Sequence, residues 1–101
     1  MTPLIPKKLK VGGAVHKVEW VEDLHTGDGE KALGKWTTRE PGQPIQLDAT
    51  QRDHPDQAFV TLLHEALHII EYELGLGLKE ATVTALGHSL AALLIDNKLF
   101  E

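Results

Sequence analysis

The sequence predicts an α+β fold, in which a small antiparallel β-sheet of three or four short strands is followed by two long α-helices. Before about residue 53, polar and apolar side chains alternate over short runs that are punctuated by turn residues. Beyond that point, apolar side chains recur at steps of three and four residues. A chain of 101 residues has the length of one domain. We therefore expect a single domain over residues 1–101, with a sheet half at 1–52 and a helical half at 53–101.

The first half contains the expected strands. Gly12-Gly13 is a hairpin signal, and the residues that follow it alternate as in a half-buried strand. A polar loop is expected at residues 23–31. Pro41-Gly42-Gln43-Pro44 predicts a turn before the last strand. The expected strands are residues 9–11, 14–22, 33–38 and 45–48.

The second half contains the expected helices, from about residue 54 to 74 and from about 79 to 97. Asp53 is predicted to cap the first helix, with Pro55 in its first turn and Gly75 as its stop. A short link at residues 76–78 allows the chain to reverse. In the second helix, an apolar stripe is expected to face the first helix, and it consists of Val83, Gly87, Leu90 and Leu94.

The first predicted helix contains the pattern HExxH, as His64-Glu65-Ala66-Leu67-His68. Four helical residues turn the chain through about 400°, so both imidazoles project from one face and can reach a single metal ion. Glu65 is angled away from the pair, where a carboxylate can accept a proton from a metal-activated water without binding the metal. The competing interpretation is an amphipathic core helix with two hydrogen-bonded histidines, but burying these polar groups is costly unless a metal compensates them.

Glu80 is the expected third ligand. It opens the second predicted helix, within about 60° of Val83 around the helix axis, so it should face the first helix. Catalytic zinc sites take three protein ligands, and two histidines with one glutamate is an established set. The alternative is a first-turn carboxylate that only favours the helix dipole. Because the chain has no cysteine, any metal must depend on imidazole and carboxylate. The prediction is one Zn²⁺ per chain, held by His64, His68 and Glu80.

Three further residues are candidates for supporting roles. Glu71 shares the stripe of the two motif histidines and could orient an imidazole N–H. Tyr72 is interpreted as a tyrosine at the edge of the core rather than as a donor to a transition-state oxyanion. His88 lies roughly 80° around the helix and about 12 Å along it from Glu80, so we interpret it as an outer-shell or surface residue. The remaining histidines have no partner spacing and are expected to be ordinary surface or strand residues, namely His16, His25 and His54.

This order of elements resembles the small zinc peptidases of the gluzincin type, in which a helix bearing HExxH is followed by a helix bearing a glutamate ligand. It looks most like the compact metallopeptidase-like proteins of bacteriophages and the ImmA/IrrE-type domains of bacteria. The resemblance is carried by residues 45–48, 62–68, 80–83 and 93–97. It implies a minimal zincin-like fold and a zinc-dependent endopeptidase in which Glu65 is the general base. It also implies β-addition of an extended substrate, to the strand at 33–38 or to the one at 45–48.

The composition limits the partners. Ten Lys and Arg against 15 Asp and Glu give a formal charge of -5, which repels phosphate backbones and anionic lipid. We therefore expect no nucleic acid and no membrane as a partner, but a peptide or protein substrate. Residues 1–10 lack the apolar run of a signal peptide, which predicts a cytoplasmic protein of a bacterial cell or a phage-infected host. The second helix carries further apolar side chains that permit a homo-oligomer, namely Ala81, Ala85, Ala91, Ala92 and Ile95.

Two other classes of function stay open. The first is a non-catalytic, zinc-stabilised module that binds a protein partner through its sheet edge. It keeps every metal ligand and predicts no peptide cleavage. The second is a metal-free helical scaffold, for which purified protein would contain no zinc.

Overall fold

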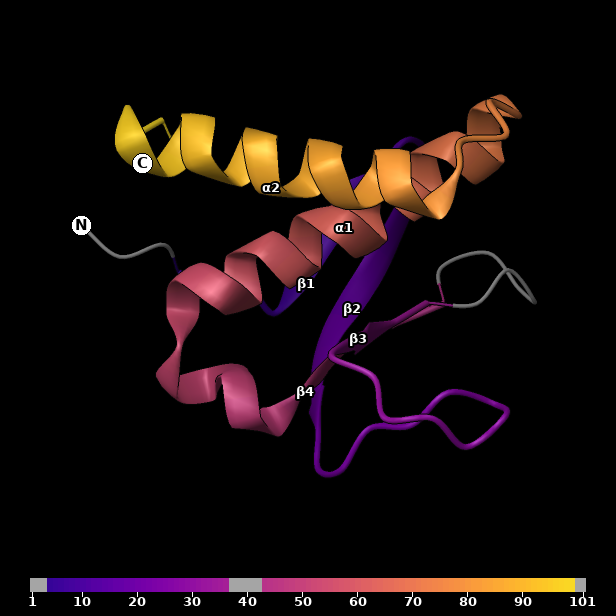
Figure 1. The fold of residues 1–101 in the computed structure, drawn as a ribbon, viewed down its shortest axis with the longest axis vertical. Helices are drawn as coiled ribbons and strands as arrows, with labels where there is room; N and C mark the ends of the chain where they lie inside the picture. Colours follow the sequence, from indigo (N-terminus) through magenta and orange to yellow (C-terminus); the bar gives the residue numbers. More distant parts are fainter. Residues whose placement is uncertain (1–3, 37–42, 100–101) are drawn as a thin grey trace.

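The computed structural model describes residues 4–36 and 43–99. Their elements are β1 (Lys8–Val11), β2 (Ala14–Val21), β3 (Gly34–Lys35), β4 (Ile45–Asp48), a 3-10 helix η1 (Ala49–Asp53), α1 (Pro55–Leu74) and α2 (Glu80–Asp96). The predicted α+β class is confirmed, with four short strands and two helices. Helix α1 lies between the sheet and α2 (Figure 1).

The sheet is mixed and has the strand order β1-β2-β4-β3. The predicted hairpin of β1 and β2 is confirmed, and Gly12 takes the positive φ of +60° that its turn needs. β2 and β4, however, run parallel, with Val18 opposite Ile45. The prediction of a wholly antiparallel sheet is therefore wrong. Parallel neighbours need a connection of about a dozen residues or more, and the long segment between Val21 and Ile45 provides one.

β3 is the edge strand on the far side of β4. Only Gly34 and Lys35 pair with β4, so the strand is shorter than the predicted 33–38, of which 37 and 38 lie outside the described residues. The first two residues of the turn predicted at 41–44 also lie outside them. β4 has the predicted range, 45–48, and is paired on both sides, by β2 and β3. Of the two strands considered for β-addition, β3 and β4, β3 therefore has one side that no described strand pairs with.

The ends of α1 combine one confirmed and one wrong prediction. Gly75 ends the helix in the left-handed region, and Leu76 N–H donates to the carbonyl of Glu71 at 3.0 Å, as in a Schellman motif. Asp53, by contrast, is not the cap of α1. It ends the unpredicted η1, and His54 occupies the cap position with no side-chain hydrogen bond. The chain already turns at Asp48, whose side chain accepts from the backbone N–H of Thr50 and so caps η1 instead.

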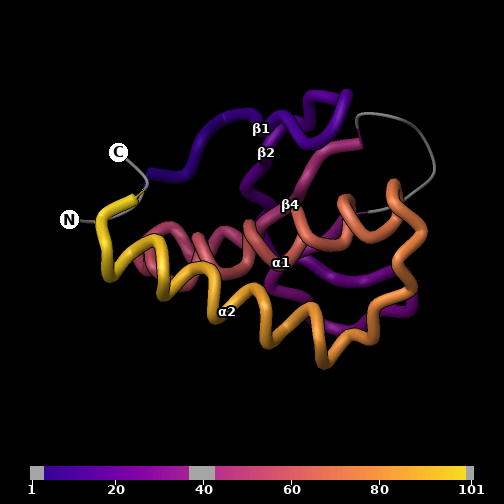
Figure 2. The backbone as a smooth tube through the Cα atoms, turned by 90° about the horizontal axis from the view of Figure 1, so that it is seen from above, coloured from indigo at the N-terminus to yellow at the C-terminus, as the bar shows by residue number. Residues whose placement is uncertain are grey.

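The packing of α2 on α1 differs in part from the predicted stripe. Val83 and Gly87 are buried as expected, but Leu90 is 37% exposed, and the third buried position is Ala91, at 1%. These buried residues are spaced by four, and their small size lets the helices approach closely as α2 runs back along α1 (Figure 2). Apart from this contact, the core lies between α1 and the sheet and contains Val11, Ile45, Leu47, Leu62, Ala66 and Ile69. Within the described ranges, neither helix has the combination of length and apolar character that crossing a bilayer requires.

Candidate metal centre

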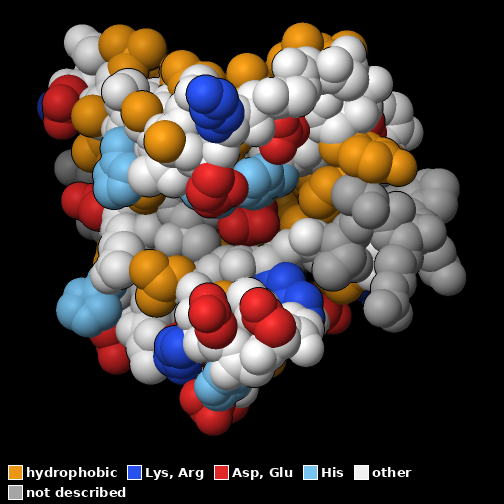
Figure 3. Space-filling model, turned by 45° about the vertical axis from the view of Figure 1, so that its right-hand side comes forward, with side chains coloured by type: hydrophobic (Ala, Val, Ile, Leu, Met, Phe, Trp, Pro, Cys, Tyr) orange, Lys and Arg blue, Asp and Glu red, His pale blue; other side chains and the backbone are white. Residues whose placement is uncertain are grey.

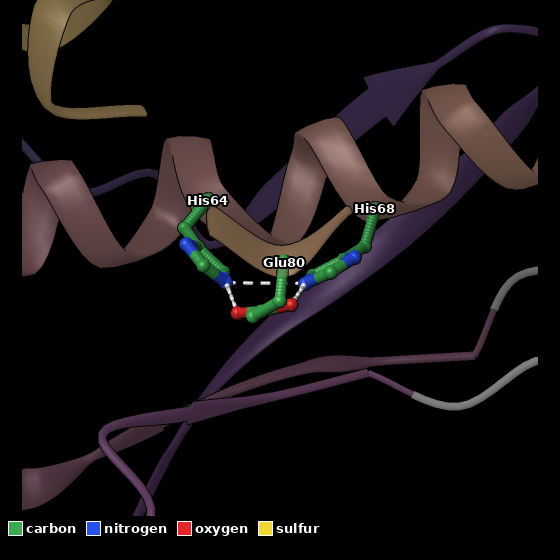
Figure 4. Close-up of side chains that lie close together, drawn as sticks. All are labelled: His64, His68 and Glu80. Carbon is green, nitrogen blue, oxygen red and sulfur yellow. Dashed lines mark hydrogen bonds and ion pairs between the residues drawn. The ribbon is translucent and has the colours of Figure 1, made fainter. Parts of the chain in front are cut away.

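The structure brings the three expected ligand residues together. His64 and His68 lie one turn apart on the same side of α1, and Glu80, at the start of α2, lies between the ends of their rings (Figure 4). The carboxylate Oε1 of Glu80 is 2.8 Å from Nε2 of His64, and its Oε2 is 3.0 Å from Nε2 of His68. The two Nε2 atoms are 3.1 Å apart. One ligand atom from each residue thus lies within 4.8 Å of the others.

The hydrogen bonds around His68 decide which of its nitrogens carries a proton. Nδ1 lies 3.0 Å from Oε1 of Glu71, so Nδ1–H is the donor, and the lone pair of Nε2 is left for a second proton or a metal ion. That lone pair faces Oε2 of Glu80, which is also an acceptor. Two acceptors at this distance repel each other unless a proton or another cation lies between them. The three side chains therefore form a set of convergent lone pairs that suits a cation.

The donor set and its spacing fit zinc. Two imidazole nitrogens and a carboxylate oxygen are a ligand set that zinc accepts, with bonds of about 2.0–2.2 Å. Tetrahedral ligands at that bond length are about 3.3 Å apart. The observed separations of 2.8, 3.0 and 3.1 Å are only a few tenths of an ångström shorter. The side chain of Glu80 is 66% exposed, so it has room for the small outward movement that this difference requires.

Glu65 lies beside the ligand group without belonging to it. Its side chain is buried, and it lies between α1 and the edge strand, since a Cβ atom at Gly34 of β3 would be 3.1 Å from Oε2 of Glu65. Burial raises the pKa of Glu65 to about 7, an effect that the charge of His68 opposes and that of Glu80 supports. A carboxyl group with a pKa in this range can accept and return a proton near neutral pH.

Glu71 connects the ligand pair on α1 to the start of α2. While its Oε1 accepts from His68, its Oε2 accepts from the backbone N–H of Leu78 at 2.8 Å. Leu78 lies two residues before Glu80 in the link between the helices. One carboxylate thus holds both the ring of His68 and the segment that leads to Glu80, which is the outer-shell position expected for this residue.

A cleft of about 950 Å³ opens in front of the ligand group, between the helices and the edge strand with the loop before it. In the space-filling view, carboxylate and histidine side chains gather around this hollow (Figure 3). Tyr72 and His88 also line it. Tyr72 is 59% exposed, and its ring contacts that of Trp36, which packs against the core. His88 is exposed and lies outside the ligand group.

The other three histidines are not part of this group. His16 is buried in β2, where its Nδ1 lies 2.7 Å from the carbonyl oxygen of Gln43. His25 and His54 are exposed. His16 is thus a strand residue and the other two are surface residues, as their lack of partner spacing predicted.

Two buried polar residues that the sequence analysis missed hold the opposite wall of the cleft. Asp48 accepts hydrogen bonds from Leu24 N–H at 2.9 Å, from Lys31 Nζ at 3.0 Å, and from the hydroxyl and backbone N–H of Thr50. These bonds, with the Thr50 hydroxyl the largest contribution, hold the pKa of Asp48 well below its usual range. A carboxylate that directly follows Leu47, at the end of the strand and before a predicted helix, was the signal that could have identified Asp48.

The second missed residue, Gln51, joins the edge strand to α1. Its Nε2 donates to the carbonyl of Leu33 at 2.8 Å, and its Oε1 accepts from the hydroxyl of Thr61 at 2.7 Å. Gln51 is 1% exposed, so both bonds are shielded from water. Leu33 immediately precedes β3, and Thr61 lies one turn before Glu65. No local sequence pattern marks Gln51, because both of its partners are ten or more residues away.

Comparison of the chain with models of protein families, with curated proteins and with solved structures finds no match. The function must therefore be inferred from the geometry of the site.

Proposed function

We propose that this protein is a zinc-dependent peptidase in which His64, His68 and Glu80 hold the metal. The observation that carries the proposal is the convergence of their ligand atoms, in which a lone pair of His68 faces a carboxylate oxygen of Glu80 at 3.0 Å. This pair of atoms requires a positive charge between them, which either a proton on Nε2 or a metal ion supplies. The ligands lie at a cleft rather than in a closed core, which is the setting of a catalytic rather than a structural zinc site.

The residues around the ligands can be assigned roles in hydrolysis. Zinc in such a site polarises a carbonyl and lowers the pKa of water to about 7. Glu65 faces the cleft without binding the metal, so its carboxylate accepts the proton of the attacking water and returns it to the leaving amine. Glu71 keeps the proton of His68 on Nδ1 and thereby leaves Nε2 free for the metal.

The substrate that fits this cleft best is an extended peptide. β4 is paired on both sides, so of these two strands β3 is the one that can add another strand, on the side that no described strand occupies. The residues of β3 line the cleft opposite the ligands. Gly34 has no side chain, so β3 packs closely against Thr61 and Glu65 of α1, which brings the carboxylate next to the strand.

Replacing Glu65 by Gln tests the proposal. We expect the variant to keep about one zinc per chain and to lose cleavage by roughly 10²- to 10⁴-fold, because the amide cannot accept the proton. Zinc is measured by elemental analysis of protein purified without chelator, and cleavage by mass-spectrometric detection of new termini in a mixture of denatured proteins. Glu73→Gln, an equal charge change at an exposed position on α1, is the control.

The possible results separate the classes of function. Undiminished cleavage by Glu65→Gln would contradict the role of this residue as base. Zinc-loaded wild-type protein that cleaves nothing would indicate the non-catalytic zinc module. Protein without zinc would indicate the metal-free scaffold.

A further inference from the structure

Beyond the metal centre, one end of the cleft is lined by two aromatic rings. Trp36 directly follows β3, and Tyr72 lies one helical turn after His68. The ring centroids are 5.8 Å apart and the planes are inclined by 67°, which is an edge-to-face contact. Both rings line the cleft, and Tyr72 is 59% exposed. The wall of the cleft that α1 and α2 form, the helical wall, therefore presents an aromatic surface to the solvent beside His64, His68 and Glu80.

The same end of the cleft has space for a ligand side chain. Gly75 and Gly77, in the link between the helices, also line it. A Cβ atom built on either glycine would meet no other group within 4 Å. Past Tyr72, this wall thus consists of backbone without side chains.

We propose that this end of the cleft is a recognition subsite for an aromatic or large aliphatic side chain of an extended peptide. The inference rests on the proposed function, because the peptide is the one that pairs with β3. Tyr72 lies four residues after His68, which is about 6 Å along the helix. An extended chain advances by about 3.3 Å per residue. Tyr72 also lies eight residues, or about 12 Å, after His64. For a peptide that runs along α1, the recognised side chain therefore lies about two to four residues from the carbonyl group at the metal centre.

The chemistry of this end favours an apolar side chain. Glu71 and Glu73 flank Tyr72 on α1, but only Glu71 lines the cleft, and both of its oxygens are engaged, by His68 and by Leu78. A cationic side chain would therefore find the aromatic rings but no free carboxylate of Glu71. A third ring or a branched aliphatic group gains contact with both rings and gives up little hydration.

Binding to a catalytically silenced protein tests the subsite. The zinc-loaded Glu65→Gln variant is titrated into fluorescein-labelled octapeptides of alanine and serine with one phenylalanine, lysine or alanine at each of the four central positions. At the best position, fluorescence anisotropy should show roughly tenfold tighter binding of the phenylalanine peptide than of the other two. Tyr72→Ala on the same background should abolish this preference, whereas Tyr72→Phe should keep it. Equal affinities, absence of binding, a preference for lysine, or a preference that survives Tyr72→Ala would each overturn the proposal.

Leu74→Ala is the matched control. It truncates an apolar side chain of α1 that is 67% exposed and does not line the cleft, so the preference should remain. Loss of the preference in this variant would contradict a local role of Tyr72.

The peptidase and the subsite can fail independently. If wild-type protein cleaves a proteome-derived peptide mixture without enrichment of aromatic or large aliphatic residues near the cut, the subsite is refuted and the peptidase stands. If it cleaves nothing, but the silenced protein binds phenylalanine peptides through Tyr72, the peptidase is refuted and the subsite stands.

Discussion

The two walls of the cleft are held in place by different kinds of interaction. The helical wall, which carries the ligand group, is formed by α1 and α2, which meet through small buried residues such as Gly87 and Ala91. The opposite wall, formed by β3 and the loop before it, has two ladder residues within the described part of the chain and depends on the buried side chains of Asp48 and Gln51. Apolar packing is spread over many weak contacts, whereas each of these polar groups serves several partners. In this wall, the strand wall, the substitution of one buried polar side chain should therefore break several hydrogen bonds at once.

The largest effect is expected on the helical wall, from His68→Ala. Removal of one of the three proposed ligands should lower zinc affinity by more than the 10- to 100-fold that outer-shell changes cause. Because bound metal stabilises the folded state by mass action, a chelator should lower the melting temperature of the wild type but not of the variant. Competition with a zinc-sensitive dye and thermal unfolding with and without EDTA measure both quantities. An unchanged zinc affinity would exclude His68 as a ligand.

Glu71→Gln should weaken zinc binding by roughly 10- to 100-fold. The amide has one acceptor oxygen, so it cannot serve both His68 Nδ1–H and Leu78 N–H, as the carboxylate does. The same dye competition measures the change. Glu73→Gln on the same helix should leave the affinity unaltered, and equal losses in the two variants would show that net charge rather than orientation is responsible.

Asp48→Asn tests the strand wall through its dependence on pH. The folded-state pKa of Asp48 is lowered, so the carboxylate contributes stability that is fully present above its unfolded pKa of about 3.9 and is lost as the pH falls through the folded pKa. Wild-type protein should therefore be more stable than the variant at pH 7, and the difference should shrink below about pH 4. Urea unfolding between pH 7 and pH 3 measures it. Asp53→Asn, at an exposed position of η1, should follow the wild type, and a constant difference for Asp48→Asn would contradict the mechanism.

The two walls also differ in how far the sequence predicts them. The helical wall follows from local spacing, because His64 and His68 share a face at four residues and Glu80 opens the next helix. The sequence also predicted the range of β4 and the stop at Gly75. Its stripe on α2 was wrong beyond Gly87, because close approach of two helices selects the small Ala91 rather than Leu90.

The strand wall depends on contacts between residues far apart in the sequence. The parallel pairing of β2 with β4 and the bonds of Gln51 to Leu33 and Thr61 leave no periodic signal in the chain. Tyr72 belongs to the helical wall by position, but its ring contacts that of Trp36, which follows β3. The position of Tyr72 at the cleft could therefore not be predicted from the spacing of residues along the helix either.

The smallest effects come from adding one methyl group to each wall. In Gly34→Ala, the new Cβ would lie 2.6 Å from Cγ2 of Thr61, a β-branched residue of α1 that cannot easily move aside. We expect a loss of about 1–3 kcal/mol in the free energy of unfolding and weaker cleavage, because the same Cβ would displace Glu65. Chemical denaturation and peptide turnover measure the two consequences.

Gly87→Ala is the counterpart on the helical wall. Its Cβ would make an ordinary contact of 3.5 Å with Cα of His64, and alanine is the better helix former. The variant should therefore be more stable by about 0.5–1 kcal/mol at unchanged zinc affinity. If both methyl groups changed the stability by the same amount and in the same direction, the two walls would not differ in their tolerance. A gain of stability in Gly87→Ala and a loss in Gly34→Ala would show that the helical wall has room for an added methyl group. The strand wall has no such room, and the added group displaces Glu65.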